Sequence, residues 1–139
     1  MAGNCHGLSN ARAVWDLITG DAHRFCDRLQ LIIDAAEEFA ANDIPSDFVI
    51  LIHGPATQFA ARSLVGTKFA NSEITSHPTA HGLLQKFVDR GGRVEVCGIA
   101  MERCAIAKDN LIACTVVERN VFVSAVALQN RGYAYMLIF

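Results

Sequence analysis

Short apolar runs rich in β-branched residues alternate along the chain with longer stretches in which apolar residues recur every three or four positions. The first pattern is typical of β-strands and the second of amphipathic helices. The patterns predict strands over residues 13–18, 47–52, 94–98, 115–118 and 133–138. They predict helices over residues 22–42, 55–64, 99–107 and 121–130, and one more that runs from Pro78 to the Gly91-Gly92 pair.

This alternation of strands and helices is typical of parallel βαβ units. The run 47–52 is apolar at almost every position, which indicates a strand buried on both faces in the middle of a parallel sheet. We therefore expect an α/β fold, a three-layer sandwich with a five-stranded, mostly parallel sheet and helices on both faces. Residues 1–10 show no periodicity and are expected to be a flexible tail, with residues 11–139 as a single domain.

Composition narrows the classes of partner. The 139 residues include 12 Lys and Arg against 14 Asp and Glu, so nothing in the net charge attracts a phosphate backbone and nucleic acid is not expected as a partner. Hydrophobic residues make up 52% of the chain and charged residues only 19%. Even so, no apolar run reaches the roughly 18 residues that a membrane-spanning helix needs.

The two ends of the chain add two further expectations. The first residues lack the basic and apolar regions of a signal peptide, which predicts a cytoplasmic protein without a membrane partner. Residues 133–139 are apolar almost throughout, and a monomer of this size has little left to cover them. We therefore expect a subunit interface at this end.

Candidate ligand-binding residues follow the predicted strands. Ligands of open parallel sheets bind beyond the carboxyl ends of the strands. In this chain polar or reactive side chains stand beside glycines at several of those positions. The predicted pocket is lined by Thr19, Gly20, Asp21, His53, Gly54, Pro55, Cys97, Gly98, Glu118 and Arg119.

Cys97 is the strongest candidate for a reactive group. It ends a predicted strand and precedes a predicted helix, and such a position favours the thiolate. His53 ends another strand and can act on the thiol as a base or as a cation. Two structural interpretations stay open: Cys97 as a small buried apolar residue, and His53 as an imidazole that donates to a backbone carbonyl.

The other cysteines point to reduced thiols, because five cysteines without regular spacing do not form a disulfide framework. Cys104 is a candidate accessory thiol seven residues after Cys97. A continuous helix separates residues at this spacing by about 10 Å, whereas a disulfide needs Cα atoms within about 7 Å. The chain has no C-x-x-C, no G-x-G-x-x-G and no P-loop, so neither a metal nor a cofactor is expected.

Several segments together form a recognisable set: His53-Gly54-Pro55-Ala56, Val96–Ile106, Asp109-Asn110-Leu111, Val116-Val117 and Leu128–Tyr135. They resemble the motifs of the DsrE/DsrF-like family, and the LQ-x-x-GYAY ending is the most distinctive of them. The resemblance implies a five-stranded α/β sandwich that assembles into a trimer, a hexamer or a dimer.

Characterised members of that family act in sulfur relay and sulfur oxidation, and hold sulfur as a persulfide or thiosulfonate on a cysteine near a strand end. Cys97 matches that cysteine, whereas Cys104-Ala105-Ile106 replaces the Arg-Gly-Ile that relatives often carry. The resemblance thus predicts a cysteine-based sulfur carrier or sulfurtransferase with sulfur donor and acceptor proteins as partners. Two alternatives stay open: a module that binds a small anion or a nucleotide, and a non-catalytic oligomeric subunit.

Overall fold

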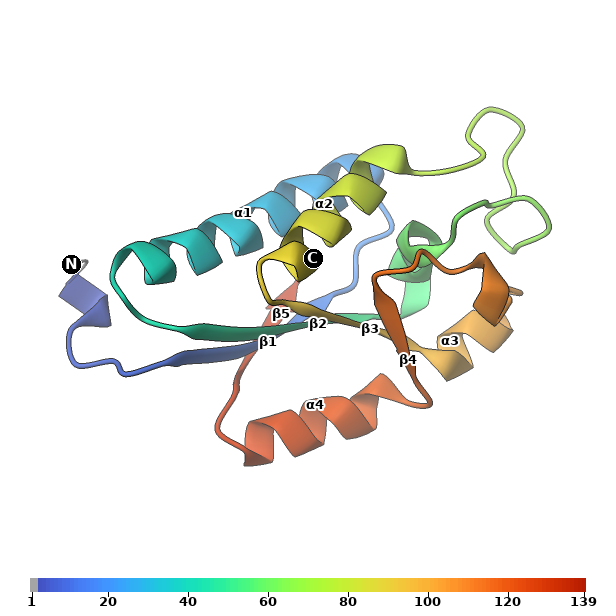
Figure 1. The fold of residues 1–139 in the computed structure, drawn as a ribbon. Coiled ribbons are helices and arrows are strands. Elements are labelled where there is room, and N and C mark those ends of the chain that lie inside the picture. Colours follow the sequence, from blue (N-terminus) through green and yellow to red (C-terminus); the bar gives the residue numbers. More distant parts are fainter. Residues whose placement is uncertain (1–2) are drawn as a thin grey trace.

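A single parallel sheet organises the molecule, which is described over residues 3–139 by a computed structural model (Figure 1). Its strands are β1 (Ala11–Leu17), β2 (Ser46–Ile52), β3 (Arg93–Cys97), β4 (Thr115–Glu118) and β5 (Ala134–Ile138). They lie in the order β4-β3-β2-β1-β5, and all four pairings are parallel. The predicted fold class is confirmed, with each strand within two residues of its expected bounds.

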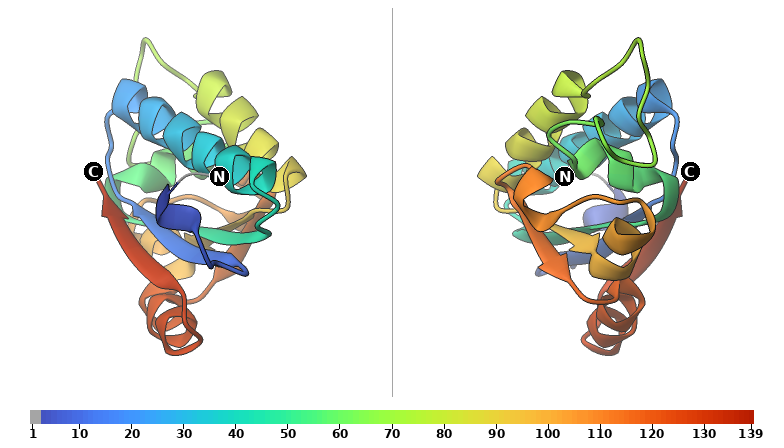
Figure 2. Two further views of the ribbon diagram at one scale, coloured as in Figure 1. Left: turned by 90° about the vertical axis from the view of Figure 1, so that its left-hand side faces the viewer. Right: turned by 90° about the vertical axis from the view of Figure 1, so that its right-hand side faces the viewer.

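Helices cover both faces of this sheet. Helices α1 (Ala22–Ala41) and α2 (Pro78–Asp89) lie side by side on one face, and α4 (Val121–Asn130) lies on the other (Figures 1 and 2). The short helix α3 (Gly98–Arg103) follows directly from the end of β3. Three 3₁₀ helices complete the set: η1 (Gly3–Cys5), η2 (Gly54–Ala60) and η3 (Lys108–Asn110).

The two faces have separate cores because successive side chains of a strand point in opposite directions. Trp15, Ile50 and Val96 belong to the larger core beneath α1 and α2. Val14 and Leu51 belong to a smaller cluster beneath α4, together with Cys97. The same alternation places other side chains on the α4 face of the sheet, namely Asp16, His53 and Glu95.

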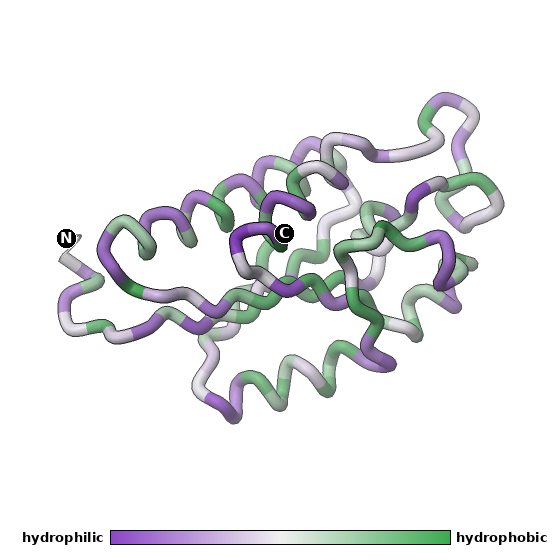
Figure 3. Tube along the Cα trace, viewed as in Figure 1, coloured by the Kyte–Doolittle hydropathy of each residue, from purple (hydrophilic) through white to green (hydrophobic). Residues whose placement is uncertain are grey.

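Helix α1 shows why its sequence folds as expected. The Asp21 carboxylate caps its first turn by accepting a hydrogen bond from the Arg24 backbone N–H at 2.8 Å. Phe25, Leu29 and Ile33 recur on one side and are buried against the sheet, while charged residues occupy the outer side (Figure 3). The predicted helix over 22–42 is confirmed to within one residue.

Two predicted helices are shorter than their patterns suggested. The helix expected over 55–64 is the 3₁₀ helix η2, because the chain turns extended at Ala61 and pairs there with Leu111. The helix expected over 99–107 ends at Arg103, because Ala105 takes a left-handed φ of 55° and the Ile106 N–H donates to the Met101 carbonyl at 3.0 Å. This ending turns Ile106 into the larger core.

The N-terminal segment and the helix lengths bear on two other expectations. Residues 1–2 of the tail expected over 1–10 lie outside the described residues; within the remainder, Gly3–Cys5 forms η1 and the Cys5 side chain is buried. No helix among residues 3–139 combines the length and the apolar character needed to cross a bilayer.

Candidate functional site

A cavity of about 460 Å³ opens where β2 and β3 end. Its walls come from the turn after β2, the loop after η2, helix α3 and the start of α4. The lining residues are His53, Gly54, Pro55, Lys68, Phe69, Cys97, Ile99, Ala100, Arg103, Cys104, Asn120 and Phe122. Because β2 and β3 are neighbours in the sheet, their carboxyl ends bring His53 and Cys97 to one cavity, as the sequence predicted.

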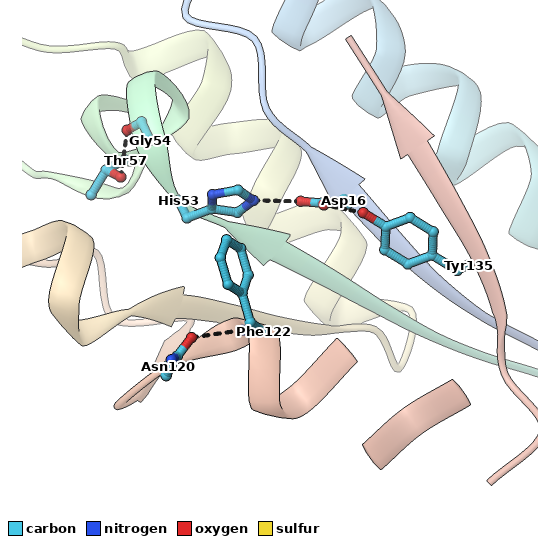
Figure 4. Close-up of polar contacts among 7 residues, drawn as sticks. All are labelled: Asp16, His53, Gly54, Thr57, Asn120, Phe122 and Tyr135. Carbon is cyan, nitrogen blue, oxygen red and sulfur yellow. Dashed lines mark hydrogen bonds and ion pairs between the residues drawn. The ribbon is translucent and has the colours of Figure 1, made fainter. Parts of the chain in front are cut away.

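The His53 ring is held by the strands beside it. Its Nε2 lies 2.7 Å from the Asp16 Oδ1, and the other oxygen of Asp16 accepts a hydrogen bond from the Tyr135 hydroxyl (Figure 4). Asp16 and Tyr135 belong to β1 and β5, and His53 directly follows β2. These three strands lie next to one another in the sheet. On the cavity side, Phe122 of α4 meets the imidazole edge to face, with ring centroids 5.4 Å apart.

The charges in this network follow from its geometry. Burial opposes ionisation of Asp16, but the hydrogen bonds from His53 and Tyr135 and the charge of His53 outweigh it, so the pKa of Asp16 lies below its usual value. Burial, together with donation to Asp16 and the negative charge there, raises the pKa of Tyr135 to about 12.

An ionised Asp16 settles which ring nitrogen of His53 bears the proton. A carboxylate can only accept hydrogen bonds, so Nε2 of His53 carries the hydrogen that Asp16 binds. The lone pair of the neutral ring is then on Nδ1. His53 therefore has one nitrogen fixed by Asp16 and the other free to accept a proton.

Cys97 is the last residue of β3 and the N-cap of α3, with only 6% of its surface exposed. Its Sγ lies 3.9 Å from the Arg119 carbonyl oxygen, a long contact that leaves the thiol weakly held. The thiol makes no capping hydrogen bond to α3. Cys97 thus combines deep burial with a place on the cavity wall.

Cys104 lines the same cavity from the other end of α3, where it is the C-cap. Its environment differs from that of the first thiol, because burial raises the pKa of Cys104 more than the Lys68 charge and the Thr57 hydroxyl lower it. The Lys68 backbone N–H also donates to the Cys104 carbonyl at 2.9 Å. Cys104 is therefore a protonated thiol at neutral pH, beside a cation.

The turn after β1 lies outside the cavity, although Thr19, Gly20 and Asp21 were expected to line it. Asp21 is used as the cap of α1, and the Thr19 hydroxyl accepts a hydrogen bond from the Asp21 N–H at 3.2 Å. Gly20 supports the cavity from behind, since a Cβ there would stand only 2.7 Å from the Pro55 Cβ. The turn thus holds the cavity wall without forming it.

The residues after β4 also point elsewhere. Glu118 forms an ion pair with Arg93 at 2.9 Å, and the exposed Arg119 side chain reaches Glu102 at 3.1 Å. Gly98 faces the Arg119 backbone instead of the cavity. Of the predicted pocket residues, only those after β2, together with Cys97 and Cys104, line the cavity.

Several side chains of the site were absent from the sequence-based set. Asp16 carried a signal, because an acid inside an otherwise apolar strand must find a partner when it is buried. Lys68, Phe69 and Arg103 carried none, since their places depend on how the loop after η2 meets α3. Among residues 3–139, no three His, Cys, Asp or Glu side chains gather as metal ligands.

The fold and the site define a class: a parallel α/β domain with a buried thiol and a carboxylate-bound imidazole at adjacent strand ends. The family model of the DsrE/DsrF-like family matches residues 14–137, and the chain belongs to this family. No functionally curated protein matches the chain significantly in sequence.

Two solved structures share the fold. One is the protein of unknown function MTH1491 from Methanobacterium thermoautotrophicum, with a TM-score of 0.68 and 17% identity. The other is the ychN protein from E. coli, with a TM-score of 0.62 and 14% identity. Each comparison covers 92% of this chain and 99% of the other chain. At these identities the likeness shows the fold alone.

Proposed function

We propose that this protein is a sulfur carrier or sulfurtransferase that holds sulfane sulfur on Cys97. The observation that carries the proposal is the meeting of a buried thiol with the His53–Asp16 pair in one cavity. In the reaction, the Cys97 sulfur attacks the outer sulfur of a persulfide donor. A new S–S bond forms at Cys97, the donor S–S bond breaks, and the donor leaves as a thiol.

His53 manages the proton of this step. Its Nδ1 takes the proton of the Cys97 thiol as the thiol becomes a nucleophile, and later returns it to the departing thiolate. Asp16 stabilises the imidazolium formed in between, since its carboxylate already binds Nε2 at 2.7 Å. Asp16 is a positioning residue in this scheme, because it acts through the imidazole.

The charge of the cavity wall favours anionic donors. Lys68 and Arg103 both line the cavity, and no Asp or Glu is among the lining residues. The same feature supports the alternative of a small-anion-binding module in which the thiol takes no covalent part. A Cys97→Ser variant separates the two functions. If Cys97 is the carrier, the variant loses sulfur loading. If the protein is an anion-binding module, the variant binds the anion as the wild type does.

The direct test is mass spectrometry of the full chain after incubation with a persulfidated donor. We expect a mass gain of one sulfur on Cys97 in the wild type and none in Cys97→Ser. Cys114→Ser is a matched control, because Cys114 is half-buried and lies outside the cavity. Loading of another cysteine with Cys97 unmodified would exclude the proposed carrier site, and an unreactive Cys97 would favour a non-catalytic subunit.

We also propose that the protein is a homo-oligomer, a trimer, hexamer or dimer, that works in the cytoplasm with donor and acceptor proteins. Large apolar side chains are exposed along α4 and β5, with Phe122, Val123 and Val126 on the helix and Leu137 on the strand. A reducing compartment suits the five free thiols. The oligomeric state is tested below by a substitution on α4.

A further inference from the structure

The two cavity thiols are arranged along a single helix. Cys97 and Cys104 are the two caps of α3, seven residues apart. A rise of about 1.5 Å per residue puts the Cα atoms of the two caps about 10 Å apart along the helix axis. Cys97 packs with the smaller cluster beneath α4, and Cys104 packs with the larger core. Both line the cavity, Cys97 beside the end of β3 and Cys104 beside the loop that carries Lys68.

This separation limits what the pair can do directly. A disulfide needs Cα atoms within about 7 Å, so the two residues cannot be joined across an intact α3. For the same reason, the sulfur of one cysteine cannot reach a single sulfur atom that is bonded to the other cysteine. A joint role for the two thiols therefore requires an elongated ligand that lies between them.

The cavity wall matches an elongated anion with a weakly hydrated body. Lys68 and Arg103 are exposed cations that take part in no ion pair within residues 3–139. Phe69, Ile99 and Phe122 add apolar wall on the same cavity. Aromatic rings and aliphatic side chains suit soft, polarizable sulfur atoms, and the cations suit terminal negative charge.

We propose, on the basis of the carrier role of Cys97, that the cavity binds an inorganic polysulfide chain along α3 and that Cys104 is its second attachment point. With S–S bonds of about 2 Å, a chain of three sulfur atoms bonded to one thiol and touching the other spans most of the length of the helix. The volume of about 460 Å³ accommodates such a chain.

The first step loads Cys97. Its thiolate attacks a sulfur inside the polysulfide dianion, one S–S bond forms, and one S–S bond breaks. The remaining sulfide or disulfide dianion leaves with the electron pair and takes up the proton that Cys97 gave to His53. One thiol and one dianion thus become one tethered anion and one hydrosulfide or hydrodisulfide anion, with no external oxidant.

The second step divides the tethered chain between the thiols. The Cys104 sulfur attacks a sulfur of the chain held on Cys97, so that the outer part becomes bonded to Cys104. The inner part stays on Cys97 with the electron pair of the broken S–S bond and receives the Cys104 proton. We expect this step to be the slower one, because burial raises the pKa of Cys104.

The experiment compares a chain donor with a single-sulfur donor on the full protein. Inorganic tetrasulfide and glutathione persulfide are incubated separately with the wild type, Cys97→Ser and Cys114→Ser. Peptide mass spectrometry after alkylation then counts the sulfur atoms on each cysteine. We expect tetrasulfide to load Cys97 and Cys104, and glutathione persulfide to load Cys97 alone.

In Cys97→Ser we expect loading of Cys104 by tetrasulfide to fall about tenfold, because its sulfur comes from the tethered chain. Cys114→Ser should match the wild type with both donors. Equal loading of Cys104 in the wild type and in Cys97→Ser would contradict the tethered chain. No loading of Cys104 with Cys97 loaded would overturn this inference and leave the carrier role standing, whereas no loading of Cys97 by either donor would overturn both.

A Lys68→Gln variant tests the binding mode without touching a thiol, and the exposed position of Lys68 keeps the fold intact. At low ionic strength we expect loading of Cys97 by the tetrasulfide dianion to slow about fivefold. Loading by dimethyl trisulfide, an uncharged donor, should keep its wild-type rate. Equal slowing with both donors, or no slowing with tetrasulfide, would contradict an anionic chain beside Lys68.

Discussion

The two faces of the sheet are covered by helices of opposite character. Helix α1 buries one side, including Phe25 and Leu29, and turns its charged side outward. Helix α4 is apolar along most of its length (Figure 3). Only Val121 of this helix is buried, and Phe122 and Val126 are exposed. The face beneath α1 and α2 is thus fully covered within a single chain, and we call it the finished face. The other face carries an apolar helix whose outer side is exposed.

The uncovered side is also the side of the candidate chemistry. Strand alternation places Asp16, His53 and Cys97 on the α4 face, and Phe122 of α4 closes over the imidazole. The larger core on the finished face packs closely against the strands that carry these groups and stabilises them. The contrast separates the larger core on one face from the exposed apolar helix and the candidate site residues Asp16, His53 and Cys97 on the other.

The largest expected effect comes from truncation on the finished face. Phe25→Ala removes a fully buried ring stacked on Phe59 at 4.2 Å, and should lower the free energy of unfolding by about 3–5 kcal/mol. Val126→Ala on α4 should cost less than about 0.5 kcal/mol under dilute conditions. Urea denaturation of both variants measures the contrast, and similar losses would break it.

Asp16→Asn tests the polar network of the α4 face, with an expected loss of about 1–3 kcal/mol at neutral pH. Burial raises the pKa of Asp16, but the hydrogen bonds that it accepts from His53 and Tyr135 together lower the pKa by more. The folded value therefore lies below the unfolded value of about 3.9. The stability that ionised Asp16 contributes is therefore complete above that unfolded value and is lost as the pH falls through the folded pKa.

Urea denaturation of wild type and Asp16→Asn across acidic pH checks this sign. The difference in unfolding free energy should stay nearly constant above about pH 5 and shrink as the pH falls from about 4 through the folded pKa of Asp16. The variant should also load Cys97 more slowly and with an altered pH profile, which a merely structural role would not produce. A difference that grows on acidification would show that ionised Asp16 does not stabilise the fold.

Val126→Glu and Leu31→Glu form a matched pair on opposite faces, because the two residues are 60% and 57% exposed. If α4 is covered by another subunit, burying a charge there should weaken association at least about tenfold. The Leu31 variant on α1 should associate like the wild type. Light scattering across a dilution series measures both, and equal behaviour would place the interface elsewhere.

Tyr135→Phe should have a small effect on stability, about 0.5–1 kcal/mol, because Tyr135 is 39% exposed and solvent screens its bond to Asp16. Burial and the nearby Asp16 raise the pKa of Tyr135 to about 12, above the unfolded value of about 10. Its contribution to stability is therefore complete below about pH 10 and is lost as the pH rises through about 12. In an absorbance titration, the variant should lack the phenol transition that the wild type shows at the highest pH.

The order and bounds of the elements could be predicted from the sequence because each pattern is local. An unbroken apolar run predicts β2 at residues 47–52. A spacing of four residues predicts α1 from Phe25, Leu29 and Ile33. The predicted ends of two helices, at residues 64 and 107, were wrong for a non-local reason. Ala61 is drawn into a bridge with Leu111, and Ile106 is drawn into the core.

The site could be predicted only where strand ends define it. Cys97 ends β3 and His53 follows the adjacent strand β2, so topology alone brings them to one cavity. The turn after β1 met the same criterion but is occupied by the cap of α1, a competition that the residues themselves do not reveal. Lys68 reaches the cavity through a loop without periodicity, so no pattern could have placed it there.

The hydrogen bonds from β5 through β1 to His53 have a consequence for biosynthesis. Tyr135 follows Cys97 and His53 in the chain, and β5 can pair with β1 only after α4 has been made. A nascent chain therefore contains Asp16 and His53 before it contains the Tyr135 hydroxyl that completes the hydrogen bonds of Asp16. The pairing of β5 with β1 therefore completes the hydrogen bonds that hold Asp16 and, through it, His53.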